Sequence, residues 1–347
     1  MLSSAIGLVE RTLVWKNRFL GVGVHPEPHR YFDAGGVDEA EQRCLATGPS
    51  FLSYIRPPRD LPLPEVERRV VIEDRRTVLH LRFHSPLPHG DPANHQVRMR
   101  VYLPPGTRPG DPVAVFHHPL YQRRWTLWEW FLEDLKERMP VAILAGPNHF
   151  ERVAPGWFAG QGTCNANPWR FFEAIRQWCW DQQLAMELLR AEGLRPATVI
   201  GFSLGAFQTL LLASAGALPE LPIVTIACPN RYAYGLEHGA LGRAIVASMR
   251  EVGIDTPRLK RMTAALALER HVQVLRGRPV LHVWGMLDPV DPQPSGKRLL
   301  AALRPTRSVP IPAGHGSLLL FRRKIAHEMR AFLGAGPIGE RLPAIRA

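Results

Sequence analysis

The sequence predicts an α/β fold with a mostly parallel central sheet and helices on both of its faces. From about residue 112 onward, short apolar or β-branched runs alternate with longer segments of helical spacing. This alternation is typical of βαβ units, in which the crossover helices cover a parallel sheet. A serine flanked by glycines also lies where one such strand gives way to a helix, and acidic and histidine candidates follow two later strands.

The chain is predicted to divide near residue 65. Residues 1–65 have the pattern of a helical N-terminal extension interrupted by prolines, and residues 66–347 that of one large domain. The domain opens with three runs of alternating polarity, Glu67–Asp74, Thr77–Ser85 and Gln96–Pro104. Such alternation favours half-exposed antiparallel strands.

The remaining elements are predicted from apolar runs and helical periodicity. Strands are expected at Pro112–His118, Pro140–Gly146, Ala197–Gly201, Leu221–Asn230, Arg278–Gly285 and Arg307–Gly314, and helices at Thr126–Met139, Arg170–Gly193 and Gly205–Leu218. Two segments interrupt the alternation: a loop at 146–168 and a largely helical insertion at about 232–277. Long insertions in a compact domain are usually lids or binding loops, so we expect the insertion to form a cap.

The composition is that of an ordinary globular protein. A chain of 347 residues is long enough to bury a sizeable core, and its content of 46% hydrophobic and 21% charged residues is ordinary for a globular protein. No apolar run reaches membrane-spanning length. Glu10 and Arg11 interrupt the apolar N-terminal stretch and no basic segment precedes it, so no signal peptide is predicted. The four cysteines form no C-x-x-C pair, which favours a reducing, cytoplasmic location.

The net charge of +12 raises the question of an anionic partner. The arginines are spread along the chain and no nucleic-acid motif accompanies them, so we do not expect nucleic-acid binding. We interpret the charge as a general field that favours anionic substrates or surfaces. Residues 4–20 are predicted to form an amphipathic helix, either packed on the domain or in peripheral contact with an anionic membrane surface. The oligomeric state is not predicted.

The serine of interest lies in the stretch Val199–Phe207, "VIGFSLGAF". Gly201, Ser203 and Gly205 form a G-x-S-x-G motif in a strand–turn–helix context. The glycines permit a sharp turn that lifts the serine hydroxyl clear of the sheet. Side chains at the two glycine positions would clash with the closely packed helix. The sequence thus predicts a nucleophilic serine at the end of a strand.

Two later strands supply partners for this serine. The strand ending at Gly285 is followed by Asp288, with Asp291 as the alternative acid, and the last strand is followed by His315 between two glycines. A serine hydroxyl becomes a good nucleophile when a histidine removes its proton and a carboxylate orients the imidazole. Because ligands gather at the carboxyl ends of parallel strands, we expect Ser203, Asp288 and His315 to meet there.

The segments "GFSLG", "GMLDPVDP", "AGHGS" and the strand-end "HHPLY" resemble those of the α/β-hydrolase superfamily. The resemblance covers roughly residues 96–333 and is weaker toward poorly characterised abhydrolase-domain proteins. It implies an α/β-hydrolase fold with Ser203 as nucleophile, His315 as general base and then acid, and Asp288 as the orienting carboxylate. The family commonly has His-Gly after its third strand, whereas this chain has His118-Pro119.

The departure at His118-Pro119 bears on the oxyanion hole. The amide of Leu204, at the start of the helix, is predicted as one donor to a developing oxyanion. Proline has no N–H, so the second donor is expected from Leu120, with Tyr121 as the alternative.

Several residues are candidates for the substrate pocket. Tyr121 follows the strand end, His149 and Trp157 lie in the 146–168 loop, and His238 lies in the helical insertion. Two neighbouring arginines, Arg123 and Arg124, could meet an anionic group but are more simply explained as partners of the following helix.

No metal or cofactor is predicted. His80 and His84 share one strand face, but no third ligand with suitable spacing follows them. No G-x-G-x-x-G or Walker motif is present.

The sequence therefore predicts a serine hydrolase that cleaves a small-molecule carboxylic ester, of the carboxylesterase type, through an acyl-enzyme. Thioester or lactone cleavage and acyl transfer use the same triad and stay open. The alternative from another class is a catalytically silent α/β-hydrolase fold used for binding.

Overall fold

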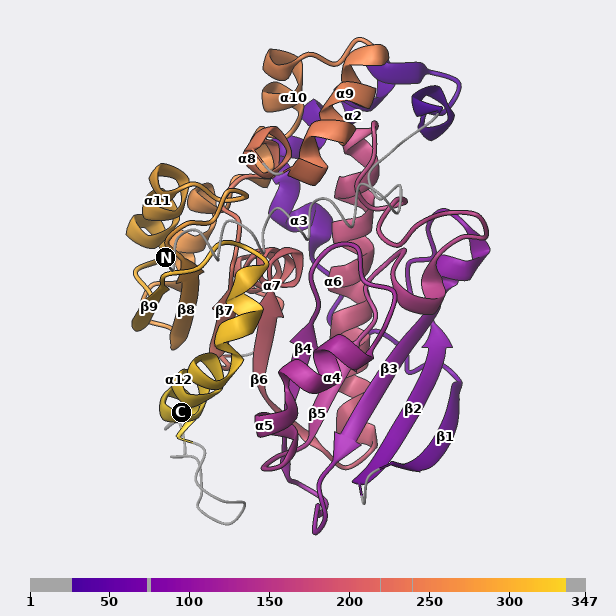
Figure 1. Ribbon diagram of the computed structural model, residues 1–347. Coiled ribbons are helices and arrows are strands. Elements are labelled where there is room, and N and C mark those ends of the chain that lie inside the picture. Colours follow the sequence, from indigo (N-terminus) through magenta and orange to yellow (C-terminus); the bar gives the residue numbers. More distant parts are fainter. Residues whose placement is uncertain (1–26, 74–75, 219, 239, 335–347) are drawn as a thin grey trace.

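The computed structural model describes residues 27–73, 76–218, 220–238 and 240–334. Its centre is a nine-stranded sheet with the strand order β1-β2-β3-β5-β4-β6-β7-β8-β9 (Figure 1). The strands are β1 (Val66–Glu73), β2 (Arg76–His84), β3 (Gln96–Leu103), β4 (Pro112–His117), β5 (Val141–Leu144), β6 (Arg195–Phe202), β7 (Ile223–Ile226), β8 (Val280–Gly285) and β9 (Arg307–Ile311). The predicted mixed, mostly parallel sheet is confirmed.

The sheet has an antiparallel part and a parallel part. Strands β1, β2 and β3 pair antiparallel to one another, and β3 pairs antiparallel to β5. From β5 to β9 every pairing is parallel. Strands β5 and β7 are buried along their whole length, because helices cover both faces there. Strand β1 at the antiparallel edge is mostly exposed.

Helices cover both faces of the parallel strands, as predicted. One core cluster joins the sheet to α4 (Thr126–Phe131), α5 (Glu133–Lys136) and α12 (Arg322–Leu333). A second cluster, on the other face, joins it to α6 (Pro168–Ala191), α7 (Leu204–Ser214) and α11 (Gln293–Leu303). The single helix predicted at Thr126–Met139 is wrong in detail: it is two short helices, because Leu132 leaves the helical region at φ −92° and ψ 6°.

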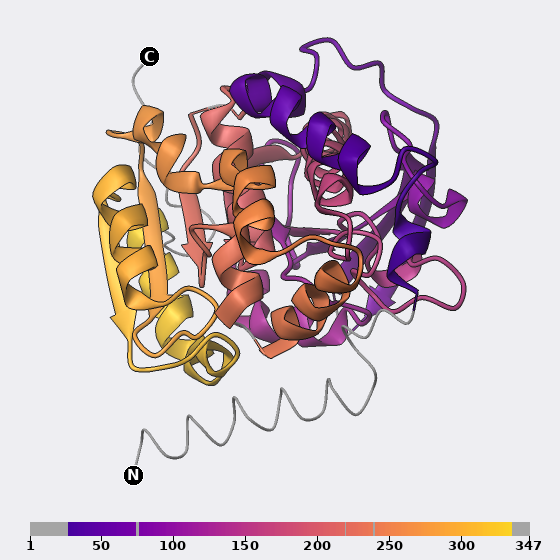
Figure 2. The same cartoon turned by 90° about the horizontal axis from the view of Figure 1, so that it is seen from above.

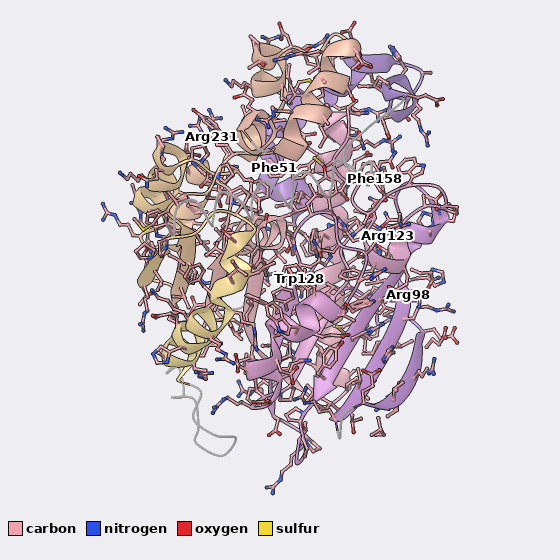
Figure 3. All side chains as sticks on the ribbon, in the orientation of Figure 1. Phe51, Arg98, Arg123, Trp128, Phe158 and Arg231 are labelled. Carbon is pink, nitrogen blue, oxygen red and sulfur yellow. The ribbon has the colours of Figure 1, made fainter. Side chains whose placement is uncertain are left out.

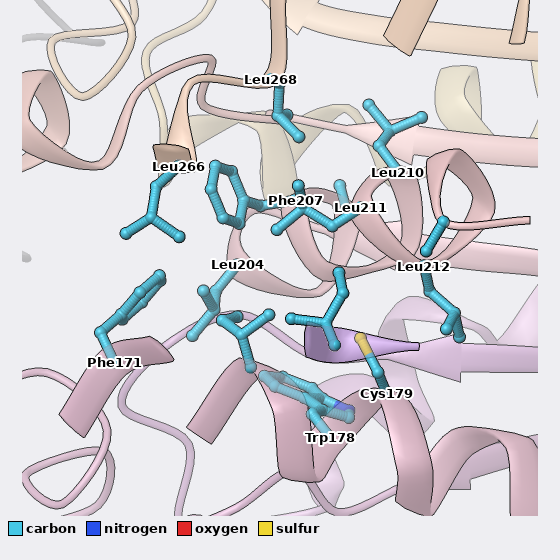
Figure 4. Packing of buried hydrophobic residues seen from close by; sticks show 14 of the residues in the cluster. Phe171, Trp178, Cys179, Leu204, Phe207, Leu210, Leu211, Leu212, Leu266 and Leu268 are labelled. Atoms are coloured by element: carbon cyan, nitrogen blue, oxygen red, sulfur yellow. The ribbon is translucent and has the colours of Figure 1, made fainter. Parts of the chain in front are cut away.

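The contact of α7 with α6 fixes the helix that follows the serine. Figure 4 shows Leu204, Phe207 and Leu211 of α7 between Phe171 and Trp178 of α6 and the leucines Leu266 and Leu268. Full burial of side chains of this size stabilises a fold by about 1.5–3 kcal/mol each. The start of α7, and with it the serine turn, is therefore held by the main core.

The N-terminal segment and the insertion after β7 lie next to each other. The described N-terminal elements are α2 (Gly36–Thr47) and α3 (Phe51–Ile55), and the insertion contains α8 (Tyr232–His238), α9 (Ala240–Glu251) and α10 (Thr256–Met262). The insertion helices and α2 lie at the same end of the molecule (Figure 1), the end that faces the viewer in Figure 2. There Arg258 of α10 forms ion pairs with Asp38 and Glu41 of α2. The insertion is helical, as predicted.

Short 3₁₀ turns complete the chain. They span Pro28–Tyr31, Gly48–Ser50, Pro92–His95, Phe150–Arg152, Ala264–Leu266, Leu268–Arg270, Val272–Leu275 and Ser317–Phe321. The amphipathic segment predicted at residues 4–20 lies outside the described residues. Among the described helices, none combines the length and the apolar character needed to cross a membrane.

Candidate active site

The serine turn has the strained backbone that the glycine pattern predicts. Ser203 lies between β6 and α7 with φ 52° and ψ −115°, a conformation that costs a non-glycine residue about 1–3 kcal/mol. A Cβ at Gly201 would lie 2.4 Å from the backbone of Ala206, and one at Gly205 would lie 2.2 Å from the carbonyl oxygen of His117. Both positions therefore require glycine, so that α7 can begin directly above the neighbouring strands.

The structure brings Ser203, His315 and Asp288 together in one hydrogen-bonded row. The Oγ atom of Ser203 lies 2.7 Å from Nε2 of His315, and Nδ1 of His315 lies 2.7 Å from Oδ2 of Asp288. Since a carboxylate can only accept here, Nδ1 carries the proton and Nε2 is left as the acceptor for the serine hydroxyl. The three residues come from the ends of β6, β8 and β9, the carboxyl edge of the parallel strands.

The second oxygen of Asp288 is held by its own loop. Oδ1 accepts hydrogen bonds from the amides of Val290, at 2.7 Å, and Asp291, at 3.2 Å. The predicted alternative acid, Asp291, thus contributes its backbone to the orientation of Asp288. Burial raises the pKa of the Asp291 carboxyl to about 7, against hydrogen bonds from Ser295 and the Asn230 backbone that lower it. The hydrogen bond of His315 Nδ1 goes to Asp288.

The three backbone amides predicted as candidate oxyanion donors differ in whether they already have an acceptor. Neither the amide of Leu204 nor that of Leu120 has an acceptor within the described part of the chain. The amide of Tyr121, which the sequence offered as the alternative donor, donates instead to Nε2 of His149 at 3.2 Å. Tyr121 has φ 66°, so the chain turns sharply directly after Leu120. Of the two candidates for the second donor, the amide of Leu120 is therefore the one without an acceptor among the described residues.

His149 supports this turn from inside the protein. It is fully buried, and its Nδ1 donates to the carbonyl oxygen of Pro147 at 2.6 Å, which leaves Nε2 free to accept from Tyr121. Burial is the main cause that lowers its pKa to about 4, so the ring is neutral near pH 7. The sequence placed His149 in the substrate pocket, whereas in the structure both of its ring nitrogens bind backbone atoms.

A second buried histidine, His118, connects the end of β4 to the segment after β5. Nδ1 of His118 lies 2.7 Å from the carbonyl oxygen of Pro119, and its Nε2 accepts from the amide of Gly146 at 2.8 Å. Burial, with a smaller contribution from His149, lowers the pKa of His118 well below its usual value. The His-His-Pro sequence after the strand was the only signal for this role, and its partner at Gly146 could not be seen in the sequence.

The 146–168 loop is anchored by a buried ion pair. Nη2 of Arg152 lies 2.8 Å from Oδ2 of Asp181 on α6, and both side chains are fully buried. The same guanidinium donates to the carbonyl oxygens of Asn94 and Ala145. The loop that contains His149 is therefore tied to α6 and to the sheet.

The described contacts of the remaining candidate residues are with other parts of the chain. Trp157 packs edge-on against Tyr31, with ring centroids 5.7 Å apart. Arg123, labelled in Figure 3, is exposed, and its Nη2 lies 3.5 Å from the carbonyl oxygen of Trp157. Arg124 is also exposed. His238 ends α8, and its side chain lies outside the described residues.

Within the described ranges, no group of three or more His, Cys, Asp and Glu side chains is arranged to hold a metal ion. A small cavity lies behind the acid loop and is lined by Cys228, His282, Asp288 and Asp291 among others. Cys228 and His282 line this cavity beside the two acidic residues, and neither takes part in the Ser203–His315–Asp288 hydrogen bonds.

Comparisons with known proteins place this geometry in a known fold. No family model and no curated protein sequence matches the chain. Solved structures do match, among them TT1662 from Thermus thermophilus, with 20% identity, a TM-score of 0.51, and 78% of this chain and 100% of that chain covered. Acetyl xylan esterase 1 from Thermoanaerobacterium sp. JW/SL YS485 matches with 15% identity, a TM-score of 0.51 and coverage of 88% and 96%.

A third match extends the comparison to a larger enzyme. Acylaminoacyl peptidase from Pyrococcus horikoshii matches with 12% identity and a TM-score of 0.55 over 80% of this chain, which spans 43% of the peptidase. At these identities the likeness concerns the fold alone. Together with the sheet order, it shows that the chain has the α/β-hydrolase fold.

Proposed function

We propose that this α/β-hydrolase-fold chain is a serine hydrolase that cleaves a carboxylic ester of a small molecule through an acyl-enzyme. The single observation that supports this best is the continuous row from Ser203 Oγ through His315 to Asp288, with 2.7 Å at each step. The strained φ of 52° at Ser203 adds to it, because such strain is kept where it positions a reacting group.

The proposed first half-reaction is acylation. Ser203 Oγ attacks the ester carbonyl carbon while Nε2 of His315 takes the hydroxyl proton. The negative charge that develops on the carbonyl oxygen is stabilised by the amides of Leu204 and Leu120. His315 then gives its proton to the leaving alcohol as the carbon–oxygen bond of the ester breaks, and the acyl group stays on Ser203.

The second half-reaction is hydrolysis of the acyl-enzyme. His315 removes a proton from water, the resulting nucleophile attacks the acyl carbon, and Ser203 leaves with the proton returned by His315. Asp288 stabilises the imidazolium in both steps and keeps Nδ1 protonated. Thioester or lactone cleavage and acyl transfer to an alcohol would proceed through the same acyl-enzyme.

Turnover of p-nitrophenyl acetate tests this proposal. We expect Ser203→Ala and His315→Ala to lower kcat by at least about 10³-fold, because each member of a triad contributes at this scale. Ser214→Ala, a matched change of a buried serine at the end of α7, should retain activity. Equal turnover by the wild type and Ser203→Ala would instead support the silent binding fold.

The location in the cell is also a proposal. All four cysteines are free and buried in the described structure, which is typical of a protein from a reducing compartment. We therefore propose a cytoplasmic location, which a fluorescent fusion or cell fractionation would test.

A further inference from the structure

The outer face of the antiparallel strands contains a second recessed site, remote in sequence from the triad. A cavity of about 150 Å³ lies over β1, β2 and β3 and extends to the start of α4. We name it the basic groove. Its lining contains the side chains of Arg69, His80, Arg82, Arg98 and Arg100, with Glu67, Trp125 and Glu151. Figure 3 labels Arg98 on this part of the sheet.

Strand register crowds positive charge in the groove. In one cross-strand row Arg82 is directly opposite Arg98, and in the next row His80 lies between Arg69 and Arg100. Like charges directly opposite each other on an antiparallel pair destabilise it. The lining contains four guanidinium groups against two carboxylates. The groove is therefore electropositive before any ligand is present.

Acidic neighbours neutralise only half of these arginines. Arg82 forms an ion pair with Glu67, and Arg100 lies 2.9 Å from Glu129 with its guanidinium over the ring of Trp125. Across the described ranges, neither Arg69 nor Arg98 has an acidic group within ion-pair distance. These two arginines are the ones that a ligand could engage.

Two buried nitrogen atoms in the lining also lack a partner. Nε of Arg98 and Nε2 of His80 are shielded from solvent, and neither makes a hydrogen bond to another described residue. Nε2 of His80 lies 4.0 Å from Glu73, beyond hydrogen-bond reach. A buried polar atom without a partner usually marks a place that water, an ion or a ligand occupies.

We propose that the basic groove binds the phosphoryl group of a small molecule. A phosphate offers several acceptor oxygens, and guanidinium groups bind such oxygens in a bidentate fashion. One water needs about 10–15 Å³ of cavity volume, so a cavity of about 150 Å³ admits a polyatomic anion. The Arg100 and His80 side chains are only 23% and 30% exposed, which favours a group that enters the cavity over a flat bilayer surface.

The test is binding of inorganic phosphate to the full chain, measured by equilibrium dialysis with labelled orthophosphate at low and at physiological salt. We expect one saturable site whose dissociation constant rises by at least about tenfold in Arg98→Gln, the scale of a lost charge-assisted hydrogen bond. Arg69→Gln, on the exposed edge strand, is the second variant and keeps the test valid if Arg98→Gln does not fold.

The matched control is Arg108→Gln. Arg108 is exposed and lies outside the groove. Its substitution removes the same charge as Arg98→Gln, so phosphate binding should be unchanged. Equal weakening in Arg98→Gln, Arg69→Gln and Arg108→Gln would show a general charge effect and overturn the proposal, as would the absence of saturable binding.

A second arm distinguishes the source of the phosphoryl group. The wild type and Arg98→Gln are mixed with vesicles of phosphatidylglycerol in phosphatidylcholine. We expect no vesicle binding that depends on Arg98. Vesicle binding that Arg98→Gln abolishes, with no binding of orthophosphate, would assign the groove to a lipid headgroup and overturn the small-molecule proposal.

Discussion

The parallel and the antiparallel parts of the sheet differ in whether the charged and polar side chains discussed above have partners. At the carboxyl edge of the parallel strands, the buried side chains that anchor the loops have partners: His149 binds the Tyr121 amide and the Pro147 carbonyl oxygen, and Arg152 binds Asp181. On the outer face of β1 to β3, arginines face one another and two buried nitrogens have no described partner. Paired groups hold loops in place for chemistry, whereas unpaired charged groups leave binding capacity for a ligand.

The largest effect is expected where the paired network meets the proposed reaction. Asp288→Asn keeps the shape of the side chain but cannot stabilise the imidazolium, and it presents an amide to Nδ1. We expect kcat for an ester to fall by about 10³- to 10⁴-fold. Asp291→Asn should stay within about tenfold of the wild type, because its amide still donates to Asp288. A larger loss in Asp291→Asn would make Asp291 the functional acid.

A stability measurement compares the two parts of the sheet directly. Arg152→Met leaves Asp181 buried without its cation, which should lower the free energy of unfolding by about 3–5 kcal/mol. The matched change Arg82→Met removes the surface partner of Glu67 and should cost less than about 1 kcal/mol. Urea unfolding of both variants at pH 7 measures the difference. Similar losses would contradict the contrast between the two regions.

His149 provides a positioning test within the parallel part. His149→Phe leaves the Tyr121 amide without an acceptor and loosens the turn after Leu120. We expect kcat to fall by about 10²-fold with KM little changed, the scale of one impaired oxyanion donor. His149→Gln should restore much of the rate, because its carbonyl oxygen can accept from Tyr121. Wild-type kcat in a folded His149→Phe protein would show that His149 does not position the turn after Leu120 for catalysis.

The buried histidines of the parallel part predict a pH dependence of stability. Burial lowers the pKa of His117 to about 3, and that of His149 and His282 to about 4. In the unfolded chain the same histidines have a pKa of about 6.5, so below that pH the unfolded state binds more protons than the folded state. Stability should therefore fall as the pH falls from about 6.5 toward 4, by about 1.4 kcal/mol per pH unit for each histidine.

The raised pKa of Asp291 acts in the opposite direction, since the folded form keeps its proton up to about pH 7 while the unfolded form does not. Urea unfolding between pH 7 and 5 tests the histidine contribution, with His282→Asn as the comparison. The slope of this variant should be shallower by about 1.4 kcal/mol per pH unit. An unchanged slope would show that His282 is protonated equally in both states.

The sequence predicted the fold and the row of triad candidates because their signals are local. Glycines around Ser203, the strand before Asp288 and the glycines beside His315 lie within a few residues of the groups they position. Strand ends of a parallel sheet then meet at one edge, so proximity in space follows from topology.

The supporting contacts could not be predicted, because they join distant segments. Tyr121 and His149 are separated by 28 residues, and their hydrogen bond depends on a positive φ at a tyrosine. The basic groove likewise depends on register, since only the pairing of β2 with β3 places Arg82 opposite Arg98. A shift of one residue would have turned these side chains to the other face.

The most direct measurement is intact-protein mass spectrometry after treatment with a fluorophosphonate. We expect a single adduct on the wild type, absent from Ser203→Ala and formed much more slowly by His315→Ala. An adduct on another residue, or no adduct on folded wild-type protein with a probe small enough to enter the site, would contradict an activated Ser203.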